Sequence, residues 1–216
     1  MASRGHVVYR AVLVACALAL AAVLWPRLPE RMPTHWNAAG EVDGHGSRLI
    51  GAFLLPGLML LMAALVPLLP RIDPRGASYE QFRPTYHLVM NAVVTLLLVV
   101  HLLVLASALG HDVPATRIIL VGVGLLLVLI GALLPRMRPN WMIGIRTPWT
   151  LSSERVWQRT HRVGGMLMLA AGVVTTLAAA LPDTRRAVPV MIGSAMVAAF
   201  GAVVYSYVAW RQEQRH

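Results

Sequence analysis

The segment IILVGVGLLLVLIGALL (residues 118–134) contains no charged side chain and is long enough, as a helix, to cross most of a membrane. A hydrocarbon core of ~30 Å takes about 20 apolar residues at helical rise. Five similar runs flank it, at residues 7–24, 49–69, 86–109, 163–181 and 188–210. These runs lack the alternation of barrel strands, and helices satisfy their own backbone hydrogen bonds in lipid. The sequence therefore predicts an all-α integral membrane bundle of six transmembrane helices.

Composition and charge support a membrane protein. The chain is 57% hydrophobic and 13% charged, with a mean hydropathy of +0.65, which is outside the usual range of soluble domains. All 19 basic residues are Arg and lie between the apolar runs, a pattern typical of membrane topology and not of nucleic-acid binding. If the runs alternate across the membrane, 13 Arg lie on the side of the amino terminus and six on the other. The positive-inside rule then predicts cytoplasmic termini in a cell (inner) membrane protein.

The first run has a competing interpretation as a cleaved signal peptide. Pro26 and Pro29 follow it where a small-residue cleavage site is wanted, which favours a retained helix. Cys16 lies within this run and is the single cysteine, so the chain cannot form an internal disulfide or a cysteine zinc site.

The chain divides into three regions. Residues 1–70 hold the first two spans and an extracytoplasmic loop (26–48), residues 71–117 hold the third span, and residues 118–216 hold the last three spans and a cytoplasmic loop (135–162). The two loops are much richer in polar residues than the other connections. They carry most of the candidate chemistry.

The outer loop is rich in Pro and Gly, which predicts compact turns. It contains side chains of the types that bind zinc-like ions: His35, Glu41, Asp43 and His45. Their spacing matches no recognised metal motif, and Asn37 and Asp43 beside glycines equally predict turn hydrogen bonds. We favour the turn interpretation and predict no metal or cofactor.

The inner loop holds six Arg and three Trp, and its second half has the pattern of a short amphipathic helix. Ser152 or Ser153 would be the N-cap, with Glu154 in the first turn. The helix is predicted to lie at the membrane interface before the fifth span. Its apolar face toward the membrane would be Val156, Trp157 and Thr160, and its basic face Arg155, Arg159 and Arg162.

The third run carries a polar stripe of His87, Asn91 and His101, which share one helix face. Intramembrane ionisable groups are costly and usually face a bundle interior or water, so one interpretation of the stripe is a proton or ligand path. We favour the other interpretation, in which His87 and Asn91 lie at interface depth and His101 makes one interhelical hydrogen bond. Small residues in the last three spans predict close helix packing: Gly122, Gly124, Gly131, Gly165, Gly172, Gly193 and Gly201. No phosphate loop, metalloprotease or hydrolase motif is present, and no acid lies in a span, so no enzyme is expected.

Two residue patterns resemble the SdpI family of bacterial multi-pass membrane proteins. The outer pattern, similar to that family's amino-terminal domain of unknown function, is Pro33, His35, Trp36, Asn37, Gly40 and Asp43. The inner pattern is Asn140, Gly144, Arg146, Thr147, Pro148, Trp149, Trp157, His161 and Gly164.

The resemblance implies a non-enzymatic immunity protein that protects its own membrane from a secreted peptide toxin. It also implies signalling, in which a small transcriptional repressor docks on the inner loop. Its partners would be membrane lipid, the toxin outside and the repressor inside. Two alternatives remain: a proton-coupled transporter using the polar stripe, and a structural role in which Arg146 pairs with helix-end carbonyls and Asn140 caps a turn.

Overall fold

The computed structural model describes the backbone of residues 2–215 and the side chains of residues 4–215. Six long helices dominate the fold: α1 (Ala2–Leu24), α2 (Arg48–Ile72), α3 (Tyr79–Ala108), α4 (Ala115–Leu133), α6 (Glu154–Ala179) and α7 (Thr184–Glu213). Each contains a segment long and apolar enough to cross a membrane. The predicted six-span helical bundle is therefore confirmed.

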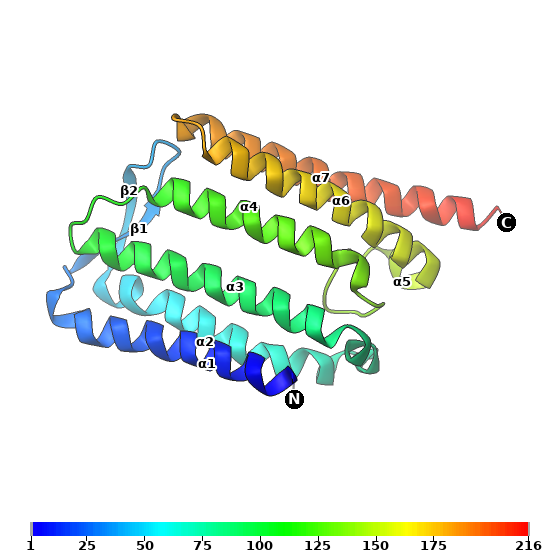
Figure 1. Cartoon of the computed structure of the whole chain (residues 1–216), viewed down its shortest axis with the longest axis horizontal. Coiled ribbons are helices and arrows are strands. Elements are labelled where there is room, and N and C mark those ends of the chain that lie inside the picture. The colour runs from blue at the N-terminus through cyan, green and yellow to red at the C-terminus, as the bar shows by residue number, and fades with distance from the viewer. Residues whose placement is uncertain (1, 216) are drawn as a thin grey trace.

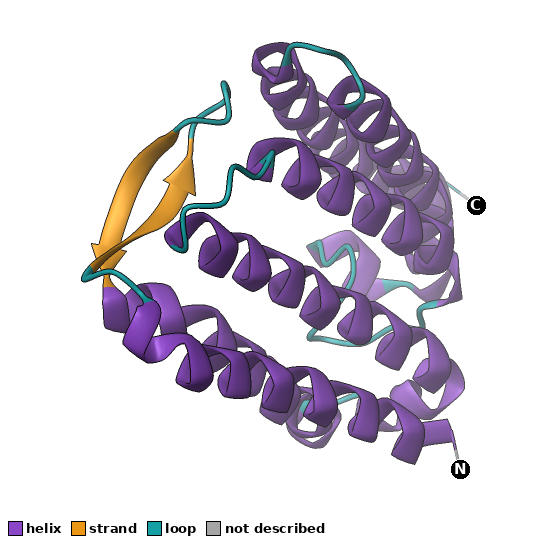
Figure 2. Ribbon diagram, turned by 60° about the vertical axis from the view of Figure 1, so that its left-hand side comes forward, coloured by secondary structure: helices purple, strands orange, loops and turns teal. Residues whose placement is uncertain are grey.

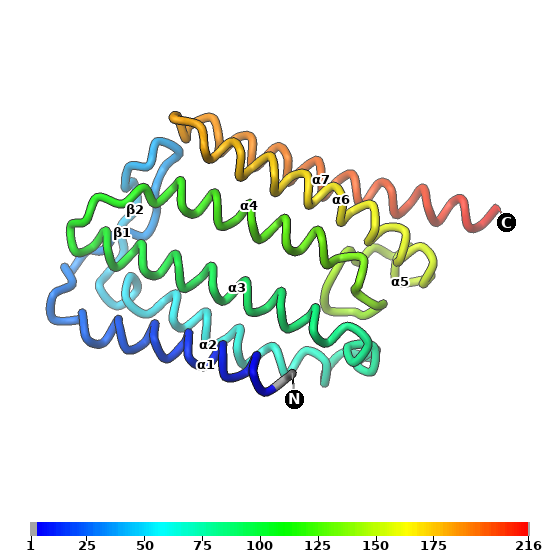
Figure 3. Tube along the Cα trace, viewed as in Figure 1, coloured from blue at the N-terminus to red at the C-terminus, as the bar shows by residue number. Residues whose placement is uncertain are grey.

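The remaining elements are short. A helix α5 (Pro148–Ser152) precedes α6, and single 3-10 turns occupy Trp25–Arg27, Gly76–Ser78 and Leu134–Arg136. Strands β1 (Arg31–Trp36) and β2 (Val42–Ser47) form an antiparallel hairpin between α1 and α2. Both termini and α5 lie at one end of the bundle, and the hairpin lies at the other (Figures 1 and 3).

The helices form two groups, α1–α3 and α4, α6 and α7 (Figure 1). In the second group, glycines let α4 and α6 approach closely, as predicted. A Cβ on Gly131 would lie 2.6 Å from the Gly165 carbonyl oxygen, and one on Gly172 would lie 2.5 Å from that of Gly124. The prediction is wrong for Gly193, where a Cβ would meet nothing within 4 Å.

Two local predictions need correction. The outer loop is a β-hairpin and not turns alone, because Met32 is fully buried against Gly51 of α2 and fixes one strand on the bundle. The segment after Ser153 is not a separate interfacial helix, since it forms the first turns of α6 without a break. Ser153 is nevertheless the predicted N-cap, and its hydroxyl accepts a hydrogen bond from the Val156 N–H.

Candidate functional site

The turn of the hairpin is built by Asn37. Its side-chain oxygen accepts hydrogen bonds from the N–H groups of Ala39 (2.9 Å) and Glu41 (3.1 Å). Gly40 has a φ of +88°, a backbone conformation that a residue with a side chain rarely adopts. The two hydrogen bonds confirm the predicted turn role of Asn37. The positive φ explains why glycine occupies position 40.

The exposed surface of the hairpin carries a hydrogen-bonded pair of side chains, His35 and Asp43. His35 Nδ1 lies 2.5 Å from Asp43 Oδ1, and their side chains are 70% and 44% exposed. Asp43 thus pairs with His35 instead of forming the predicted Asx turn. Gly44 faces His35 across the hairpin, and a Cβ there would lie 2.8 Å from the His35 Cβ. Within residues 4–215 no three His, Cys, Asp or Glu side chains are grouped closely enough to hold a metal ion.

Two hydrogen bonds fasten the hairpin turn to the second helix group. Thr116, in the first turn of α4, donates to the Asn37 carbonyl oxygen (3.0 Å), and Thr184, at the start of α7, donates to that of Ala38 (2.8 Å). Figure 2 shows the hairpin reaching from the α1–α2 side across this end of the bundle. Neither threonine was predicted as a site residue, because no local pattern marks contacts between residues 79 and 146 positions apart in the chain.

At the opposite end, buried polar groups fix the inner loop. The Asn140 side-chain oxygen accepts from the N–H groups of Met142 (3.0 Å) and Ile143 (2.8 Å), so Asn140 does cap a turn. Asp73, which follows α2, accepts from the Trp141 N–H (2.9 Å) and from the Tyr79 hydroxyl (3.1 Å). The loop is therefore fastened to the first helix group.

His161 and Trp157 form the buried centre of the inner loop. Their rings stack with centroids 4.0 Å apart, and the Trp157 indole N–H donates to the Met137 carbonyl oxygen (2.9 Å). His161 donates from Nδ1 to the Trp157 carbonyl oxygen (2.9 Å) and accepts at Nε2 from the Ile145 N–H (3.2 Å). Gly144, with a φ of +103°, passes directly over the imidazole.

This arrangement corrects the predicted orientation of the amphipathic segment. Val156, Trp157 and Thr160 do share a face, but all three are buried in the protein and do not face the membrane. The reason is that the loop folds back over the start of α6. Gly164 on the same helix meets the Ile145 side chain, where a larger residue would clash.

The rest of the inner pattern forms a capped turn against α7. Thr147 is the N-cap of α5, in a reciprocal capping box with Thr150, and its hydroxyl donates to Ser206 of α7 (3.0 Å). Pro148 begins this helix, where its missing N–H is tolerated. The ring of Trp149 packs on Tyr207, with centroids 5.1 Å apart.

The groups left exposed in this loop surround a shallow crevice of about 490 Å³ whose lining includes Trp141, Arg146, Pro148 and Leu151. Arg146 donates to the Trp141 carbonyl oxygen (2.6 Å), which is a loop carbonyl and not a helix end. The loop thus presents an apolar and basic surface, while Trp157 is excluded from it.

The polar stripe of α3 faces α1. Asn91 accepts a hydrogen bond from Arg10 (2.7 Å) and donates to His6 (2.9 Å), and His87 stacks on His6 at 5.3 Å. Further along the helix, His101 is fully buried and donates from Nε2 to the Ala17 carbonyl oxygen (3.2 Å). Arg10 entered the predictions as one of the Arg that set topology and as a basic residue before the possible signal peptide, yet it is 2% exposed and lies at the centre of this contact.

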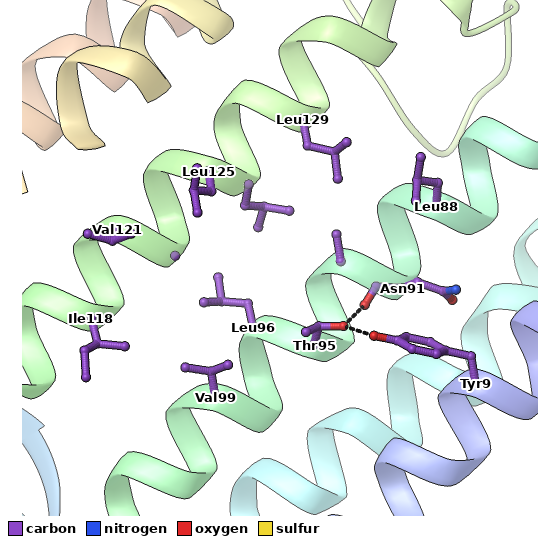
Figure 4. Close-up of a pocket in the computed structure, with 13 residues that line it drawn as sticks. Tyr9, Leu88, Asn91, Thr95, Leu96, Val99, Ile118, Val121, Leu125 and Leu129 are labelled. Atoms are coloured by element: carbon purple, nitrogen blue, oxygen red, sulfur yellow. Dashed lines mark hydrogen bonds between the residues drawn. The ribbon is translucent and has the colours of Figure 1, made fainter. Parts of the chain in front are cut away.

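Beside the stripe, an apolar crevice of about 620 Å³ separates α3 from α4 (Figure 4). Its walls are mainly Leu, Val and Ile, and Tyr9 and Thr95 bring the hydroxyls that hydrogen-bond at 2.9 Å. The two helix groups therefore meet loosely along this line. The hairpin and the inner loop connect them at the two ends.

Comparisons with known proteins match both motif regions. Residues 12–60, which include the hairpin, match a domain of unknown function, DUF1648, and residues 136–206 match the SdpI/YfhL protein family. The chain is also 27% identical over 163 residues to "Immunity protein SdpI" of Bacillus subtilis (strain 168), which covers 76% of each chain. Through these two regions and this relative, the chain resembles the SdpI family. No solved structure matches the chain.

The two family matches cover the two regions of the chain that carry its polar motifs. The family region begins at the inner loop and continues through α6 into α7. With six apolar helices, the chain is a multi-pass membrane protein related to an immunity protein.

Proposed function

We propose that this protein protects the membrane that holds it against a secreted peptide toxin, by a non-enzymatic mechanism. The observation that carries the proposal is the similarity to an immunity protein over three quarters of both chains. The Arg excess at the end with the termini supports cytoplasmic termini. The hairpin then lies outside, where a secreted peptide arrives first.

In this proposal the hairpin recognises the peptide. His35 and Asp43 offer a donor and an acceptor on a rigid, exposed support, since Asn37 and Gly40 fix the turn. A surface pair of this kind contributes about 0–1 kcal/mol to folding, so its place on the hairpin is better explained by recognition than by stability.

The hairpin is also hydrogen-bonded to helices of the second group. Thr116 connects its turn to the start of α4, which leads into the inner loop. Thr184 connects it to the start of α7, which packs against that loop through Ser206 and Tyr207. A peptide that binds one arrangement of these contacts more tightly would shift the population of bundle conformations. Signalling to a small cytosolic repressor would use the exposed surface around Trp141 and Arg146, because aromatic and Arg side chains contribute strongly to interfaces.

The test is survival and membrane potential of a sensitive host that expresses the chain and is challenged with the toxin peptide of the SdpI family. We expect wild type to protect and His35→Ala to lose protection at equal protein level. His45→Ala is the matched control, because His45 is exposed on the same hairpin and lies outside the His35–Asp43 pair.

The contrary result is equally clear. Absence of protection by wild type would exclude immunity to this peptide. Full protection by both the His35 and the His45 variant would show that His35 is not needed for recognition. The transport and structural alternatives would then take precedence.

A further inference from the structure

A cavity of about 340 Å³ lies among α1, α2 and α3 at the end of the bundle that carries both termini. Its apolar walls include Val7, Val66 and Pro67. Two Arg line it from different helices: Arg71 from the last turn of α2 and Arg83 from the first turns of α3. The cavity therefore combines apolar walls with a basic lining at the ends of membrane-spanning helices.

A buried cation lies behind one wall of this cavity. Arg10 is 2% exposed, and among residues 4–215 no carboxylate lies within 4 Å of it. Its Nη1 donates to Asn91 (2.7 Å) and to His87 Nδ1 (3.5 Å), and both acceptors are neutral or basic. A buried charge without an opposite charge is expensive, so a counter-charge nearby is favoured. His87 touches Arg10 and also lines the cavity, which makes the cavity the adjacent space for that counter-charge.

The lining itself keeps a positive excess. Glu80 is its one acid and pairs with Arg83 at 3.2 Å, which leaves Arg71 and the buried Arg10 without a carboxylate partner. Low-dielectric walls strengthen the field of these charges inside the cavity. Guanidinium groups match phosphate oxygens in geometry and can donate to them in pairs.

We propose that this cavity binds the phosphate group of an anionic membrane lipid. Arg71 and Arg83 donate to the phosphate oxygens, Arg10 contributes charge from behind His87, and the apolar walls receive the first part of an acyl chain. The apolar lining favours a lipid over a free anion, because a free phosphate gains nothing from Val7, Val66 and Pro67.

The test uses the full chain, delipidated in a neutral detergent, and follows its thermal unfolding as ligand is added. The probes are a short-chain phosphatidylglycerol, the matching phosphatidylcholine and inorganic phosphate. The variant is Arg71→Gln/Arg83→Gln. Its control is Arg159→Gln/Arg162→Gln, which removes the same charge from exposed positions on α6, away from the cavity.

We expect phosphatidylglycerol to stabilise wild type and control at the same concentrations, and the Arg71/Arg83 variant to need about tenfold more lipid, since two charged hydrogen-bond donors are lost. Phosphatidylcholine should have a smaller effect. Stabilisation by inorganic phosphate at least as strong as by the lipid would overturn the lipid assignment. An unchanged response of the Arg71/Arg83 variant, or equal weakening in the control, would overturn the site. If the substitutions destabilise the fold itself, the variant will already unfold at a lower temperature than wild type when no ligand is present.

Discussion

Replacing Gly144 by Ala tests whether the inner motif is a folded, buried unit. Gly144 has a φ of +103°, and a Cβ there would lie 2.5 Å from His161 Nε2. An L-residue with positive φ costs about 1–2 kcal/mol. The imidazole must also move, which breaks the partly buried hydrogen bond from the Ile145 N–H and costs about 1–3 kcal/mol. The sum is roughly 2–5 kcal/mol of lost stability.

Gly110→Ala is the matched control. Gly110, at the end of α3, has a φ of +85° and nothing within 4 Å of its Cβ position, so it loses only the conformational part. Thermal unfolding of both purified variants in detergent measures the difference. At about 2–4 °C per kcal/mol, Gly144→Ala should unfold roughly 5 °C below Gly110→Ala. Equal unfolding temperatures would show that a Cβ at position 144 does not clash with His161. That result would contradict the conclusion that the inner motif is a closely packed, buried unit.

Three further predictions concern contacts between distant segments. Thr116→Val with Thr184→Val should speed amide exchange in the hairpin turn, because each lost hydrogen bond removes about 1 kcal/mol of anchoring; unchanged exchange would count against the anchor. Arg10→Gln removes a buried charge that has no carboxylate within 4 Å among residues 4–215, so it should raise the unfolding temperature of the delipidated protein; a lower temperature would show that the charged hydrogen bond to Asn91 outweighs that cost. His101→Ala should reduce protein abundance without changing toxin protection; abolished proton-coupled transport with intact assembly would instead favour the transporter alternative.

The candidate site was only partly predictable from local sequence. Asn37, Gly40 and Ser153 act through neighbours within a few residues, so turn and capping rules found them. The hairpin strands were missed because Pro33 and Gly44 are poor strand formers, and their pairing depends on packing against α2 and on the turn.

The sequence by itself determined the six spans, because the length of an apolar run is a local property that can be compared directly with the thickness of a bilayer. It also identified the two motif regions and the helix face shared by His87, Asn91 and His101. The tertiary structure decided what those faces meet. Amphipathic spacing shows that Trp157 belongs to one face, but only the folded loop places that face inside the protein. The burial of Arg10 and the anchoring by Thr116 likewise depend on segments far away in the chain, which no local pattern specifies.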